Sequence, residues 1–87
     1  MDVPKLPDYF QPTSSWIKQM DMFGPVWCIR GTEITTGFEI VLVFMQWGAE
    51  PIQLSCIQEA RSGRLLLRSG DVSHEQLVGG ILTVMFS

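Results

Sequence analysis

The sequence predicts one small α+β domain with two layers. It has an antiparallel meander of about four strands, a short N-terminal helix and a C-terminal helix. Three observations support this prediction. The chain has 87 residues, which is enough for one domain only. Its middle alternates apolar side chains at the period of strands and is interrupted by short turn sequences. Both ends instead space apolar residues three or four positions apart, as helices do.

Residues 1–12 are predicted to form an extended segment ahead of a single domain over 13–87. The segment contains three prolines, which fix φ and bias the preceding residue away from helix. Tyr9 and Phe10 are adjacent aromatic residues within it. They indicate that the second half of the segment docks on its own domain or on a neighbour.

A short helix is predicted over 14–23. Thr13 and the two serines after it are good N-cap residues and directly follow a proline. Trp16, Met20 and Phe23 then occur at positions i, i+4 and i+7, which places them on one helical face. The Gly-Pro pair that follows would end the helix.

From Val26 onward the pattern is typical of strands. Residues 26–34 mix β-branched and aromatic side chains, and Thr-Thr-Gly at 35–37 is a turn sequence. Residues 38–47 alternate with both faces apolar, as expected of a central strand that is covered on both sides or has one face in an interface. The six consecutive apolar residues at 40–45 are far fewer than the ~20 that a membrane-spanning helix needs.

Two further strands complete the predicted meander. Residues 52–60 alternate, which places Leu54 and Cys56 on the same face. Arg-Ser-Gly at 61–63 is a turn sequence that ends in glycine, and it leads into a strand over 64–69. Connections this short favour antiparallel neighbours.

The last segment, 73–86, has two interpretations. Ser73 and the glutamine three residues later form a capping-box pattern, and leucine, isoleucine and methionine follow at four-residue spacing. Gly79 and Gly80 argue against a helix, because each costs about 1 kcal/mol in a helix interior. They would instead suit a hairpin that leads into an edge strand. We favour the helix.

The composition indicates a protein that works by contact with other proteins. Hydrophobic residues make up 46% of the chain and charged residues 17%, against about 25% charged in typical domains. A chain this small buries only about 60% of the surface that its unfolded form exposes, so some apolar residues must lie outside. We expect a non-enzymatic adaptor, inhibitor or assembly factor of phage or mobile-element origin that forms a homodimer. The alternative is a monomer with scattered exposed apolar residues.

Four residues are the candidates for contact with this partner: Trp16, Met22, Phe23 and Trp47. Aromatic residues and methionine are enriched in protein interfaces, and methionine adapts to varied partners. The alternative for Trp16 and Phe23 is that they form the core side of the predicted helix.

No catalytic residue, cofactor or metal site is expected, because no chemical motif is present. Cys28 and Cys56 have no CxxC partner, and His74 is the only histidine. The first residues contain no apolar stretch of signal-peptide length, so we expect a cytoplasmic protein with two reduced, mostly buried thiols and no membrane contact. One alternative function remains, a small enzyme or ligand-binding domain with Glu50, Cys56 and His74 at a pocket.

A second alternative function is contact with nucleic acid. Arg61, Arg64 and Arg68 are half of the six basic residues and lie within eight positions, on a predicted hairpin. A basic hairpin can contact phosphates. However, the net charge is −3, and the rest of the chain does not extend the basic cluster.

Overall fold

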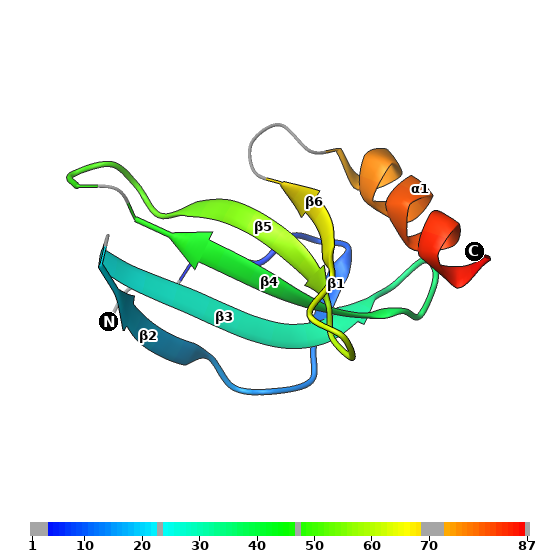
Figure 1. Cartoon of the computed structure of the whole chain (residues 1–87), viewed down its shortest axis with the longest axis horizontal. Coiled ribbons are helices and arrows are strands. Elements are labelled where there is room, and N and C mark those ends of the chain that lie inside the picture. The colour runs from blue at the N-terminus through cyan, green and yellow to red at the C-terminus, as the bar shows by residue number, and fades with distance from the viewer. Residues whose placement is uncertain (1–3, 23, 47, 69–72, 87) are drawn as a thin grey trace.

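The computed structural model describes residues 4–22, 24–46, 48–68 and 73–86, and over these ranges the chain forms one curved antiparallel sheet and one helix (Figure 1). The elements are β1 (Phe10–Pro12), β2 (Ile17–Asp21), β3 (Gly24–Glu33), β4 (Glu39–Met45), β5 (Gln53–Glu59), β6 (Leu65–Arg68) and α1 (His74–Met85). The α+β class is therefore confirmed. The sheet has six strands, where about four were predicted.

β3 organises the sheet. It is ten residues long, and β1 and β2 both pair with the same edge of it. β2 pairs with its first half and β1 with its end. Phe10 of β1 lies opposite Glu33, and Ile17 of β2 lies opposite Cys28. On its other edge β3 pairs with β4, and β5 and β6 follow in chain order, all antiparallel. The predicted meander of about four strands therefore does not match the sheet, because β1 and β2 add two strands to the free edge of β3.

The predicted N-terminal helix over 14–23 is wrong, because residues 17–21 form strand β2. An isolated helix of this length is marginal, since its first turn is costly to nucleate. The long free edge of β3 offers backbone hydrogen bonds instead. Trp16 and Met20 do not share a helical face: Trp16 packs into the core, whereas Met20 is exposed. Phe23 lies outside the described residues.

The core lies on one face of the sheet. Alternate residues of β3 and β4 point into it, and α1 and the segment before β1 cover it. The buried apolar residues are Phe10, Trp27, Ile29, Ile40, Leu42, Phe44, Ile57, Leu77 and Ile81. Trp16 contacts Trp27 and Phe44 edge-on, with ring centroids 6.2 and 5.7 Å away. Trp16 and α1 thus cover separate parts of the core.

The C-terminal segment is a helix, as we favoured. Ser73 accepts a hydrogen bond from the Gln76 backbone, and the Gln76 side chain accepts one from Ser73, so the predicted capping box is present. Leu77 and Ile81 are fully buried and dock α1 beside β6 (Figure 1). Within the described ranges no helix has the length and apolar character needed to cross a membrane.

A bulge in β5 changes which residues share a face. Leu54 lies opposite Phe44, and Cys56 lies opposite Val43, so the register shifts between them. Phe44 and Val43 point to opposite faces of β4. Leu54 therefore packs toward the core and Cys56 points away from it. The prediction that Leu54 and Cys56 share a face is wrong, because one extra residue in a strand reverses the alternation.

Gly31 in β3 is required by the close approach of β1. A Cβ atom at this position would meet the Phe10 ring and the Gln11 carbonyl oxygen. A Cβ atom at Gly79, on the outside of α1, would meet nothing within 4 Å. An added methyl group would therefore clash with β1 at Gly31, whereas at Gly79 it would fit without a clash.

We predict opposite effects for the same substitution at these two positions. Gly31→Ala should lower the free energy of unfolding by about 1–3 kcal/mol, because it overpacks the contact between β1 and β3. Gly79→Ala should raise it by up to about 1 kcal/mol through helix propensity. Urea denaturation of both variants measures the difference. Equal effects of the same sign would contradict the packing described.

Candidate interaction surface

The face of the sheet opposite the core has an apolar middle. The register aligns Ile17, Cys28, Val43 and Cys56 across four neighbouring strands. Other apolar residues of the same face flank this row on both sides. We call the set the outer face, and it comprises Ile17, Val26, Cys28, Val41, Val43, Met45 and Cys56.

The outer face is unusual because the row through its centre, Ile17, Cys28, Val43 and Cys56, carries no charged or amide side chain. Gln19, Gln53 and Gln58 lie on the same face, opposite the residues that flank this row. A sheet with one face on the core normally alternates apolar residues inside with polar residues outside. Here the outward residues are Val26 and Cys28 on β3 and Val41, Val43 and Met45 on β4. All five are half-buried. In Figure 1 the segment that leads into β1 passes behind the sheet, on the core side, where Leu6 and Tyr9 pack against the core. Among the described elements, α1, Trp16 and this segment all cover the core face.

Charged residues lie at the rim of the outer face, and two of them neutralise each other. Arg30 of β3 lies opposite Val41 of β4, and its Nε atom donates a 3.1 Å hydrogen bond to the Glu39 carboxylate. The hydrogen bond and the charge of Arg30 lower the pKa of Glu39. Arg68 of β6 lies opposite Cys56, at the other side of the face. The surface is therefore an apolar centre with charged residues at its rim.

Both cysteines belong to this face and are free thiols. They flank Val43 on the two neighbouring strands, so their Cα atoms are roughly 9.5 Å apart, beyond the ~7 Å limit for a disulfide. Burial raises the pKa of both thiols. Cys28 raises the pKa of Cys56 further, and Arg68 opposes this. Both thiols are half-buried, where the sequence predicted mostly buried ones.

The four predicted partner-binding residues do not form one described surface. Trp16 is half-buried and packs on the core. Met22 follows β2 and is 85% exposed. Phe23 and Trp47 lie outside the described residues. Sequence reasoning missed most of the outer face, although the two apolar faces of 38–47 signalled that a second apolar surface exists.

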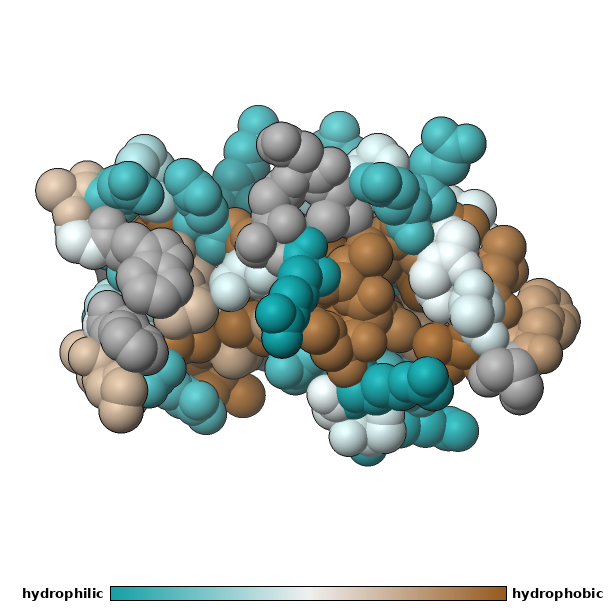
Figure 2. All heavy atoms as spheres, turned by 45° about the horizontal axis from the view of Figure 1, so that its top comes forward, coloured by the Kyte–Doolittle hydropathy of each residue, from teal (hydrophilic) through white to brown (hydrophobic). Residues whose placement is uncertain are grey.

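A second apolar region covers the side of the molecule that bears β6 and α1. Figure 2 turns this side toward the reader and shows hydrophobic residues gathered over its middle, with hydrophilic residues around them. The large exposed apolar residues of these two elements and the following C-cap are Leu65, Leu82, Met85 and Phe86. α1 is therefore apolar toward the core and partly apolar toward solvent.

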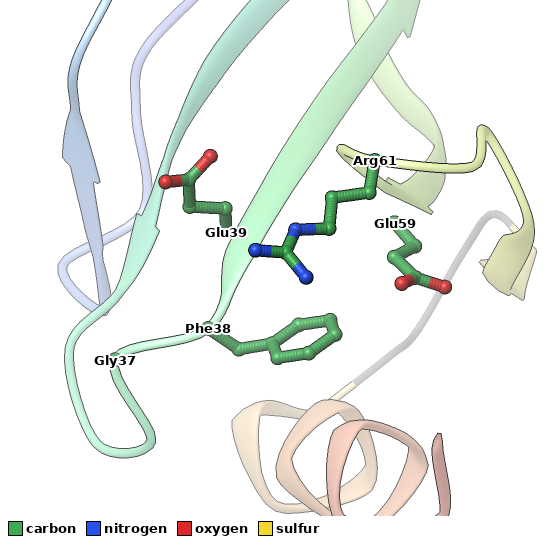
Figure 3. Close-up of a pocket in the computed structure, with 5 residues that line it drawn as sticks. All are labelled: Gly37, Phe38, Glu39, Glu59 and Arg61. Atoms are coloured by element: carbon green, nitrogen blue, oxygen red, sulfur yellow. The ribbon is translucent and has the colours of Figure 1, made fainter. Parts of the chain in front are cut away.

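A small hollow of about 320 Å³ opens beside the β5–β6 turn and is lined by Gly37, Phe38, Glu39, Glu59 and Arg61 (Figure 3). The Arg61 guanidinium extends toward the Phe38 ring, between the two carboxylates. Glu39 already binds Arg30, and Glu59 accepts a hydrogen bond from Ser62. Both carboxylates beside this open hollow thus have hydrogen-bond partners within the chain.

The three arginines proposed for nucleic acid take different positions. Arg61 extends into the hollow between two glutamates, Arg64 follows the β5–β6 turn, and Arg68 lies at the rim of the outer face. The turn between β5 and β6 confirms the predicted hairpin. Acidic residues interrupt the basic cluster, which leaves little support for a phosphate-binding surface.

The residues of the predicted pocket do not converge. Glu50 is exposed in the β4–β5 connection, and Cys56 is on the outer face. His74 begins α1 and contacts the fully buried Glu33 on the core side. Sequence reasoning did not anticipate the pairing of Glu33 with His74, because 41 residues separate them. Among the described residues, no three histidine, cysteine or acidic side chains come together as a metal site.

We predict slow alkylation of Cys28 and Cys56 in the native protein. Half-burial and a raised pKa both lower the concentration of accessible thiolate, which is the reactive form. Iodoacetamide at neutral pH should modify the folded protein several-fold more slowly than the urea-unfolded chain. Mass spectrometry of each cysteine measures the rates. Equal rates in the two states would show that the outer face is more open than described.

Comparisons of this chain with protein-family models, with curated proteins and with solved structures found no match. The apolar outer face, with its Arg30–Glu39 pair and its two thiols, is the feature on which a function can be proposed.

Proposed function

We propose that this protein is a small non-enzymatic interaction module, an adaptor, inhibitor or assembly factor, that acts through its outer face. We further propose that the outer face binds a second copy of the chain. One observation carries the proposal: the centre of the sheet is apolar on the side that no described element covers. Covering such a surface removes apolar area from water, which is the main driving force of association.

The size of the outer face supports a modest dimer. The four strands that carry the outer face, β2 to β5, span three gaps of about 4.8 Å, or roughly 14 Å. β4 has seven residues at about 3.4 Å each, or roughly 24 Å. Two such faces present about 700 Å² of flat area, and the pleat and side chains add to it. Specific interfaces begin near about 1,000 Å², so we expect a dimer that dissociates on dilution.

The charge pattern of the outer face also favours a second copy. In a two-fold dimer the same surface of each copy faces the other, so any net charge would meet its like. Arg30 and Glu39 neutralise each other within one copy, and Arg68 lies at the edge of the face rather than at its centre. Two sheets can then pack face to face about 10 Å apart, with valines such as Val41 and Val43 interdigitating at the centre.

We predict that the double variant Val41→Thr, Val43→Thr is monomeric at concentrations where the native protein is dimeric. Threonine keeps the shape and strand preference of valine but places hydroxyl groups in the interface. The dissociation constant should rise at least about tenfold. Light scattering on a sizing column, over a wide range of concentration, measures the mass.

Ile34→Thr is the matched control, since Ile34 is 59% exposed and follows β3 outside the outer face. It should leave the dimer unchanged. A native protein that stays monomeric at the highest concentration would overturn self-association. A dimer that survives the double variant would show that another surface holds the two copies together.

A further inference from the structure

Glu33, the last residue of β3, carries a fully buried carboxylate. It accepts hydrogen bonds from the backbone N–H groups of Thr35 and Thr36, at 3.0 and 2.7 Å, and from the Thr36 hydroxyl at 2.8 Å. These three bonds hold the tight turn between β3 and β4. The carboxylate is thus the organising group of that turn.

A fourth contact of Glu33 leads to the helix. Nε2 of His74, the first residue of α1, lies 2.6 Å from the Glu33 carboxylate. The His74 ring also stacks on Tyr9, with centroids 4.5 Å apart and the planes within 6°. The Thr35 hydroxyl lies 3.4 Å from the same Nε2 atom. Three segments distant in sequence therefore meet at the start of α1.

Among the described residues, α1 is also attached through its apolar face. Its buried residues are Leu77 and Ile81, and β6 is the element whose backbone it adjoins. The contacts of Trp16 with Trp27 and Phe44 lie on β3, β4 and the connection before β2 and do not involve α1. Opening of α1 would expose Leu77 and Ile81 but would leave the backbone pairing of the central strands in place, and such local opening costs less free energy than global unfolding.

We propose that Glu33, His74 and Tyr9 form an acid-sensitive latch that holds α1 on the sheet. Protonation of the Glu33 carboxylate opens the latch and releases the helix before the strands separate. This inference concerns the core side of the sheet and does not rest on the proposed function of the outer face.

The direction of the pH effect follows from the bonds to Glu33. Burial raises the pKa of this carboxyl group, but the hydrogen bonds from His74, Thr35 and Thr36 outweigh burial and lower the pKa to about 2. A lowered pKa gives stability that is full above the unfolded value of 4.5 and is lost as the pH falls toward 2. Tyr9 also faces this cluster, and burial and the charge of Glu33 raise its pKa, so it remains neutral in acid.

Hydrogen exchange of the native protein tests the latch directly. Between pH 7 and pH 2.5, we expect the protection factors of α1 amides to fall at least about tenfold before those of β3 and β4 change. Dimer dissociation would not mimic this result, because α1 is on the other side of the sheet from the outer face. Simultaneous loss of protection in α1 and the strands would overturn the proposal.

Glu33→Gln removes the charge while keeping the shape of the side chain. It should lower α1 protection at neutral pH at least about tenfold and abolish the acid step. Glu50→Gln, at an exposed loop residue, is the matched control and should behave like the native protein. Should Glu33→Gln fail to fold, His74→Asn removes the ring contact, leaves the turn intact and should still lower α1 protection alone. Unchanged α1 protection in a folded latch variant would refute the latch.

Discussion

The period-two alternation of β3 and β4 is the constraint on which the rest of this structure depends. Both sets of alternate residues in these strands are largely apolar, so burying one set leaves the other outside. The core takes Trp27, Ile29, Leu42 and Phe44, and α1 and Trp16 cover it. The opposite set becomes the outer face. A fold of one sheet and one helix has no described element left to cover this second surface.

Strong local patterns allowed parts of the fold to be predicted from the sequence. The unbroken apolar alternation identified β4 as the central strand, and the capping box at Ser73 identified α1 in spite of its two glycines. The helix expected over 14–23 failed because a weak local preference lost to the free edge of β3. Strand pairing is a long-range interaction, and the spacing of apolar residues within ten positions does not reveal it.

The candidate site was harder to predict than the fold. Cys56 reaches the outer face only through the bulge in β5, and nothing in the local sequence marks that bulge. Glu33 and His74 meet through the tertiary fold across 41 residues, so their pairing could not be read from spacing. Exposed aromatic residues and methionines were the sequence clues to a partner, yet Trp16 packs into the core. The half-buried valines and cysteines of the outer face gave a weaker signal.

The core face and the outer face have separate roles in this account. We propose that the core face holds the helix through an acid-sensitive contact and that the outer face binds a second copy. The most direct test of the central claim is the alkylation rate of Cys28 and Cys56 as a function of protein concentration. If the outer face closes on a second copy, both rates fall as concentration rises and level off when the dimer is complete. Rates that do not depend on concentration would contradict the claim.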